Sequence, residues 1–173
     1  EKSLKVDSTY VDAINARALI YVEQKQYDLA IKEYERGIAL AEIDPNGASY
    51  CYISRATQYE RLREYDKAEA DYSSAIALEP ENAERYSSRA WFYYNYKKDY
   101  DKALIDFTKA KELDEDNAVR WYCIGYVYQL GFKDYANALE YYEKSLEVDS
   151  TYVNAMSARG LIYVNQKQYD LAI

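Results

Sequence analysis

The sequence predicts an all-α protein, a solenoid in which pairs of antiparallel helices repeat along the chain. Two observations predict this fold class. First, a small residue followed three positions later by tyrosine recurs five times, at steps of 38, 34, 35 and 35 residues, which is the period of a two-helix repeat. Second, the chain of 173 residues holds only 5 Gly and 2 Pro, too few for a protein of strands and turns.

The first helix of each repeat is indicated by three positions that share one face. The small residue and its tyrosine lie at helical spacing from a large side chain four positions before the small residue. The small residues and tyrosines are Ala18 with Tyr21, Ala56 with Tyr59, Ala90 with Tyr93, Gly125 with Tyr128, and Gly160 with Tyr163. The large side chains are Ile14, Tyr52, Tyr86, Trp121 and Met156.

A second amphipathic helix follows each first helix after a short polar link. It opens with a tyrosine, has a small alanine three residues on, and continues with a bulky ring and another small residue. The opening pairs are Tyr27 with Ala30, Tyr65 with Ala68, Tyr100 with Ala103, Tyr135 with Ala138, and Tyr169 with Ala172. The rings are Tyr34, Tyr72, Phe107 and Tyr142, and the small residues after them are Gly37, Ala75, Ala110 and Ser145.

Together these positions resemble the tetratricopeptide-repeat (TPR) family, and the resemblance covers the whole chain. One repeat meets the family pattern almost completely, with Tyr52, Ala56, Tyr59, Ala68, Tyr72, Ala75 and Pro80. The resemblance implies antiparallel helix pairs that stack into a right-handed superhelix. The departures are local: four extra residues near 41–45, one extra residue in the link between helices of the third and fourth repeats, and two missing closing prolines.

The repeat boundaries make residues 1–173 a single array. The expected parts are the end of a preceding repeat at 1–9, repeats at 11–48, 49–82, 83–117 and 118–152, and a partial repeat at 153–173. Residues 1–31 match residues 143–173 at 25 of 31 positions, which indicates a 142-residue superrepeat and a longer parent chain. Because each end holds part of a second helix, we expect copies of this chain to be able to stack head to tail.

A charge pattern inside each repeat predicts an ion pair. Arginine precedes the small residue of the first helix, and an acid precedes the ring of the second helix. The pairs are Arg17 with Glu33, Arg55 with Asp71, and Arg89 with Asp106, whereas Ile124 and Tyr141 replace both members in the fourth repeat. We expect the paired groups to lie within about 4 Å. At that distance they would fix the register of the two helices in a repeat more than they would stabilise the fold. The alternative is solvated charges that match by accident.

Composition and charge exclude several functions. The net charge of −8, from 30 acidic and 22 basic residues, disfavours nucleic acid. The sequence has no histidine, glycine-rich phosphate loop or activated nucleophile, so we expect no enzyme, cofactor or metal site. Cys51 and Cys123 are interpreted as reduced packing residues. The sequence contains no run of about 18 apolar residues, the length that would predict a membrane span. The compartment stays open, with the cytoplasm favoured.

The resemblance also implies a binding surface. In the family, the first helices line a concave groove through positions six and three before the small residue and one, four and five after it. The candidate partner-binding residues are Tyr50, Ile53, Arg61, Ser87, Trp91, Tyr94, Asn95, Tyr122, Tyr126 and Gln129. Further groove positions are Asp12, Asn15, Leu19, Val22, Glu23, Thr57, Glu60, Glu84, Val119, Leu130, Asn154, Ser157, Leu161, Val164 and Asn165. We expect Trp91, Tyr94, Tyr122 and Tyr126 to share one concave, partly exposed surface.

Two functions fit this surface. The first is a protein-interaction scaffold that binds a peptide or a partner helix in the aromatic and amide groove. The second is a structural array that self-associates and has no dedicated ligand, in which case the rings pack against the facing repeat. The groove lacks the basic clamp with which some family members hold acidic chaperone tails, and this absence favours an extended, partly apolar peptide or a helix.

Overall fold

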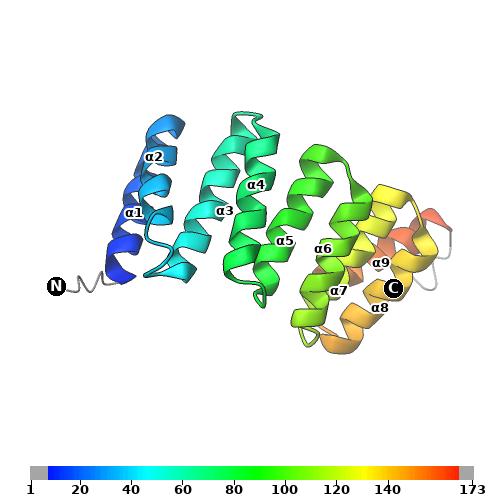
Figure 1. The fold of residues 1–173 in the computed structure, drawn as a ribbon. Helices are drawn as coiled ribbons and strands as arrows, with labels where there is room; N and C mark the ends of the chain where they lie inside the picture. Colours follow the sequence, from blue (N-terminus) through cyan, green and yellow to red (C-terminus); the bar gives the residue numbers. More distant parts are fainter. Residues whose placement is uncertain (1–7, 168–173) are drawn as a thin grey trace, which may run out of the picture. The chain divides into compact units, whose positions relative to one another are not determined.

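The computed structural model describes residues 8–167, and this part of the chain consists of helices joined by short turns (Figure 1). It divides into two compact units, whose boundary falls between Ser88 and Arg89. The first unit contains α1 (Ser8–Glu23), α2 (Tyr27–Ile38), α3 (Pro45–Arg61), α4 (Tyr65–Leu78) and the start of α5 (Ala83–Phe92). The second contains the end of α5, η1 (Tyr93–Lys97), α6 (Tyr100–Leu113), α7 (Ala118–Tyr126), η2 (Val127–Phe132), α8 (Tyr135–Val148) and α9 (Val153–Asn165). The prediction of an all-α protein is therefore confirmed.

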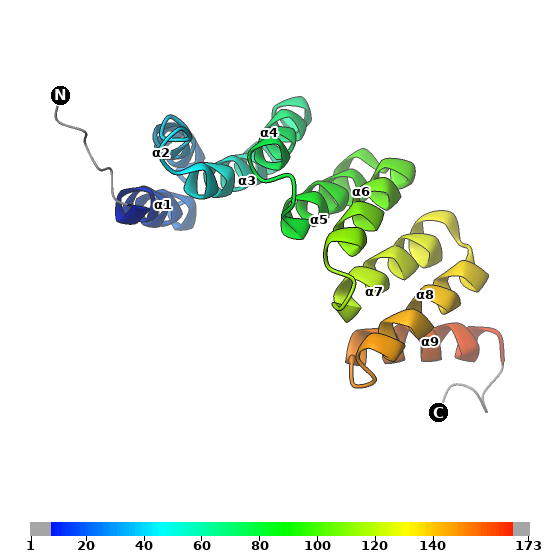
Figure 2. The same ribbon diagram turned by 60° about the horizontal axis from the view of Figure 1, so that its bottom comes forward.

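Each unit is built from antiparallel helix pairs. In the first unit, α1 packs on α2, α2 on α3, and α3 on α4; in the second, α6 packs on α7, α7 on α8, and α8 on α9 (Figure 2). Within residues 8–167, no helix is both long and apolar enough to cross a membrane. Tyr169, Ala172 and the two end segments expected to stack head to tail lie outside the described residues.

The small residues of the repeat allow the paired helices to approach closely. Ala18, Ala56 and Ala90 are fully buried. Gly125 takes the place of alanine in the fourth repeat, because a Cβ atom there would lie 2.8 Å from the ring of Tyr142. The second-helix alanines Ala30, Ala68, Ala103 and Ala138 and the rings Tyr34, Tyr72, Phe107 and Tyr142 are likewise buried. The core therefore follows the small residues and second-helix rings of the predicted stripes, whereas Met156 and Tyr135 of the same stripes are exposed.

The predicted ion pairs are confirmed. Arg55 donates two hydrogen bonds to Asp71, at 2.8 and 2.7 Å, and both side chains are largely buried. Arg89 holds Asp106 in the same way, at 2.7 and 2.9 Å. Arg17 also pairs with Glu33. In the fourth repeat, the Tyr141 ring stacks on Tyr128 instead, with centroids 5.5 Å apart and planes at 14°.

Both repeats with one extra residue contain a π-helical turn, η1 or η2. The repeat pattern predicts the extra residue in the link between helices, and this prediction is wrong. The residue lies in the first helix instead, because a π-turn accommodates one residue more than an α-turn. The hydrogen bonds that close the turn are Gln26 N to Tyr21 O and Glu64 N to Tyr59 O in the shorter repeats, and Asp99 N to Tyr93 O and Asp134 N to Tyr128 O in the longer ones. Each second helix in the described part of the chain thus starts at its tyrosine.

The turn between paired helices is closed by a basic residue with left-handed backbone. These residues are Lys25, Arg63, Lys98, Lys133 and Lys167, with φ between 55° and 61°. Most helices that end in this conformation use glycine there, since a Cβ atom makes it unfavourable. The four extra residues of the first repeat form turns after α2, and the Asp44 side chain then caps α3 by accepting from Gly47 N at 2.9 Å.

Candidate functional site

Four aromatic side chains of the second unit form one continuous group, here called the aromatic cluster: Trp91, Tyr94, Tyr126 and Tyr122. The Trp91 ring lies 5.8 Å from Tyr94 and 5.6 Å from Tyr126. Tyr126 in turn lies 5.4 Å from Tyr94 and 5.9 Å from Tyr122. All four side chains are half-buried. The four rings therefore contact one another and are partly exposed, as expected, whereas their position in a concave, partner-binding groove stays a prediction.

Local helix geometry and core rings hold this cluster in place. Tyr122 and Tyr126 are four residues apart on α7, so their side chains lie on one face. Beneath them, the buried second-helix rings act as supports: Phe107 meets Trp91 edge-on at 5.0 Å, and Tyr142 stacks on Tyr122 at 5.6 Å. Because packing against the core rings already restricts these side chains, they lose little further conformational freedom when a ligand covers them. This favours binding.

Two tyrosines of the cluster, Tyr94 and Tyr122, have raised pKa values. Burial raises the pKa of Tyr122 to about 12, and the neighbouring Tyr152 and Tyr126 add to the shift. Burial also raises the pKa of Tyr94 to about 12, again with a contribution from Tyr126. A phenolate would be poorly solvated among other rings. The Tyr94 and Tyr122 hydroxyls are therefore neutral at pH 7, and that of Tyr94 is engaged with Tyr126.

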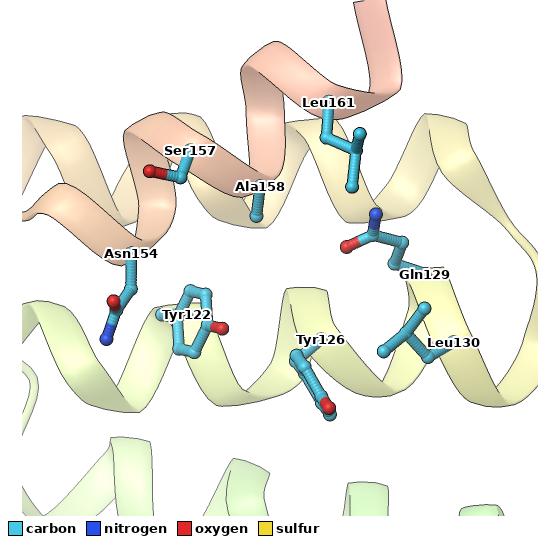
Figure 3. Close-up of a pocket in the computed structure, with 8 residues that line it drawn as sticks. All are labelled: Tyr122, Tyr126, Gln129, Leu130, Asn154, Ser157, Ala158 and Leu161. Atoms are coloured by element: carbon cyan, nitrogen blue, oxygen red, sulfur yellow. The ribbon is translucent and has the colours of Figure 1, made fainter. Parts of the chain in front are cut away.

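A cavity of about 290 Å³ adjoins the cluster between α7–η2 and α9 (Figure 3). Its wall consists of Tyr122, Tyr126, Gln129, Leu130, Asn154, Ser157, Ala158 and Leu161. No side chain of this wall carries a full charge at neutral pH. The volume lies just below the range of roughly 300–1,000 Å³ of pockets for whole small molecules. The cavity therefore suits one or two uncharged side chains.

Gln129 joins the cavity to the core. Its side-chain oxygen accepts a 2.6 Å hydrogen bond from the Tyr142 hydroxyl, and only 6% of the residue is exposed. Because its oxygen is engaged and the residue is almost completely buried, Gln129 offers little area to a ligand. The repeat pattern predicts Gln129 as a groove residue but does not predict this hydrogen bond.

The predicted groove residues of the first unit differ in how far they are exposed to solvent. Tyr50 and Arg61 are exposed, and the Arg61 guanidinium lies over the Tyr27 ring, 5.7 Å from its centroid. Ile53 is half-buried. Ser87, in contrast, is buried, with 5% of its surface exposed. Ser87 therefore offers little area to a partner, and its place in the groove stays a prediction.

Two residues at this site were missed, and one predicted residue stands apart. Tyr152 meets Tyr122 edge-on at 5.5 Å. The sequence could have indicated it, because this tyrosine falls outside the packing positions of the repeat. Ala158 completes the cavity wall but is two residues before the small residue, outside the positions carried over. Asn95 is exposed but does not line the cavity.

Within residues 8–167, no three His, Cys, Asp or Glu side chains are grouped as metal ligands.

Comparison with known proteins gives a consistent family match. Tetratricopeptide-repeat patterns match residues 11–44 and 119–152, and a second pattern of the same kind matches residues 53–118. The small glutamine-rich tetratricopeptide repeat-containing protein 2 of Saccharomyces cerevisiae is 40% identical over 63 residues. That match covers 36% of this chain and 17% of the yeast protein.

Solved structures show the same fold. Yeast Tom70 aligns with a TM-score of 0.78 and 23% identity, over 99% of this chain and 36% of that one. Pseudomonas aeruginosa PilF aligns with a TM-score of 0.74 and 23% identity, over 95% and 72% of the two chains. A crystal structure of MamA gives 0.67 and 21%, over 90% and 87%. At these identities the similarity establishes the repeat architecture alone.

Proposed function

This chain belongs to the tetratricopeptide-repeat family, and from that premise we propose that it is a non-catalytic scaffold that binds a segment of a partner protein on the aromatic cluster and the adjoining cavity. Members of the family generally act as protein-protein interaction scaffolds. The partner of this chain and its binding residues form the content of the proposal.

One observation carries the proposal: four large rings remain half-exposed although they touch one another. Trp91 and the three tyrosines expose apolar faces next to an uncharged cavity. Tryptophan and tyrosine dominate interface energetics, because they bury large areas with few rotatable bonds. A surface that served packing alone would gain from covering these rings completely.

The alternative function is a structural spacer that self-associates without a dedicated ligand. The contact between Trp91 on α5 and Tyr126 on α7 favours it, since that contact joins neighbouring first helices as packing would. The two functions differ in what the isolated protein does. A spacer forms oligomers on its own, whereas a binding scaffold needs no second copy.

A pull-down with a matched control tests the proposal. The bait is the wild-type protein, a triple variant Trp91→Ala/Tyr94→Ala/Tyr126→Ala, or Tyr135→Ala, which removes an equally large ring that is 43% exposed outside the cluster. We expect a defined partner to be retained by wild type and Tyr135→Ala and lost by the triple variant. Light scattering after size-exclusion chromatography should show a monomer. Concentration-dependent oligomers, together with equal capture by all three baits, would favour the spacer.

A further inference from the structure

We propose that Tyr94 and Tyr126 form a site of oxidative modification, at which a one-electron oxidant joins the two rings as dityrosine. The reaction needs no bound partner, because it depends only on how the two side chains lie. Three features favour it: the distance between the rings, the contact between their hydroxyl groups and the tilt of their planes.

The two hydroxyl groups meet, and the rings lie side by side. A hydrogen bond links the Tyr94 and Tyr126 side chains, and their ring centroids are 5.4 Å apart. Two phenols hydrogen-bonded end to end would have centroids about 8 Å apart, for a hydrogen bond of about 2.8 Å. The shorter distance means that the rings are folded towards one another. Because each Cε atom is bonded to the carbon that bears the hydroxyl, a Cε of one ring then lies near a Cε of the other.

This arrangement resembles that of the product. In dityrosine a single bond joins the Cε atoms of two phenols, so the hydroxyl groups are neighbours and the ring planes are twisted about the new bond. The planes of Tyr94 and Tyr126 are inclined by 55°. Tyr128 and Tyr141, in contrast, are stacked with planes at 14°, so that their faces meet rather than their edges. The tilted pair is therefore better placed to couple than the stacked pair.

Tyr100 provides an internal comparison. Its ring also lies 5.4 Å from that of Tyr94, with planes at 49°. The side-chain hydrogen bond of Tyr94, however, is made with Tyr126. If ring distance alone directed the coupling, Tyr100 and Tyr126 would react equally. Because the hydroxyl contact brings the Cε atoms together, we expect Tyr126 to be the partner.

The reaction balances with an external one-electron oxidant. Each phenol loses one electron to the oxidant and one proton to water, which leaves two tyrosyl radicals. The unpaired spin of each radical extends to Cε, where the two combine to form the new carbon–carbon bond. Each joined Cε then releases its hydrogen as a proton while the oxygen regains one, so both phenols are restored. The pair loses two electrons and two protons in all, and water can take up the protons because both residues are partly exposed.

The new bond joins two neighbouring repeats of the second unit. Tyr94 lies in η1, and Tyr126 is the last residue of α7, 32 positions further along the chain. A covalent link of this span restricts the unfolded chain, as a disulfide does. The cross-linked protein should therefore show a thermal midpoint for the second unit that is higher by about 10 °C or more.

The test oxidises the whole chain at low concentration with a photoexcited ruthenium polypyridyl complex and persulfate, which takes up two electrons and becomes sulfate. Dilution favours coupling within one molecule, because adjacent rings have a high effective concentration. Gel electrophoresis isolates the monomer, whose dityrosine is measured by fluorescence and located by mass spectrometry of proteolytic peptides. Tyr126→Phe and Tyr100→Phe are matched variants, since each removes the hydroxyl group from one ring neighbour of Tyr94.

In the wild type and in Tyr100→Phe, we expect a link between Tyr94 and Tyr126, with a mass two hydrogen atoms below the sum of the two peptides. The yield in the monomer should fall about tenfold or more in Tyr126→Phe, and equally in wild-type protein unfolded by urea. An unchanged yield in Tyr126→Phe or in urea would overturn the inference. So would a link that maps to Tyr100, or oxidised wild-type monomer that contains no dityrosine.

Discussion

Tyr72 donates a 2.7 Å hydrogen bond from its buried hydroxyl to the carboxylate of Glu60. The fourth repeat contains the same contact between Tyr142 and Gln129, at 2.6 Å. In both repeats the acceptor lies four residues after the small residue of the first helix. The third repeat has Phe107 and needs no acceptor. The first repeat breaks the rule, because it has Tyr34 but presents Val22 at the acceptor position.

The first prediction concerns this mismatch. The Tyr34 hydroxyl is buried without a hydrogen-bond partner, although Ser54 is near enough to influence its pKa. We expect Tyr34→Phe to raise the free energy of unfolding by about 1 kcal/mol, since an unsatisfied buried group is removed. Urea denaturation measures the change. The matched variant Tyr72→Phe should lower the free energy of unfolding by about 1–2 kcal/mol, because the buried hydrogen bond from Tyr72 to Glu60 is lost. Equal effects at both sites would contradict the prediction.

The left-handed turn residues give a second prediction. Lys133 has φ of 61°, where glycine has no Cβ penalty. We expect Lys133→Gly to stabilise the protein by about 0.5–1 kcal/mol, the strain relieved exceeding the entropy that glycine adds to the unfolded chain. A rise in thermal midpoint reports it. Lys109→Gly, within α6, should instead cost about 1 kcal/mol. A loss of stability at position 133 would show that the turn is unstrained.

The ion pair of the third repeat predicts a strong coupling. Asp106→Asn removes the negative charge that Arg89 holds through two hydrogen bonds and should cost about 3 kcal/mol. The fourth repeat supplies a rescue, since Ile124 and Tyr141 occupy these positions there and Tyr141 stacks on Tyr128. We expect the double variant Arg89→Ile/Asp106→Tyr to be more stable than either single variant. A double-mutant cycle measured by chemical denaturation checks the coupling, and simple additivity would refute it.

Alkaline pH should destabilise the second unit. The pKa of Tyr94 and Tyr122 is raised to about 12 in the folded chain from about 10 when unfolded. Between these values the unfolded state loses protons that the folded state keeps, so stability is intact below pH 10 and falls as the pH rises towards 12. Absorbance at alkaline pH should show late-ionising tyrosines. Tyr94→Phe/Tyr122→Phe should reduce the pH dependence, and an unchanged profile would contradict the raised values.

The sequence by itself determined the repeated helix pairs, the buried small residues and rings, and the Arg-acid partners. These features repeat every 34 to 38 residues, and each is fixed by spacing within one helix or between two paired helices. Periodicity therefore suffices to predict them.

Only the tertiary structure decided how the left-over side chains meet. It joined Trp91 to Tyr126, which are 35 positions apart in the sequence, and it engaged Gln129 with Tyr142. It also buried Ser87 and moved the extra residues into the π-turns η1 and η2. Such contacts depend on how one helix pair packs on the next, and many side-chain sets satisfy the same repeat pattern. The shape and chemistry of the candidate site arise from that packing.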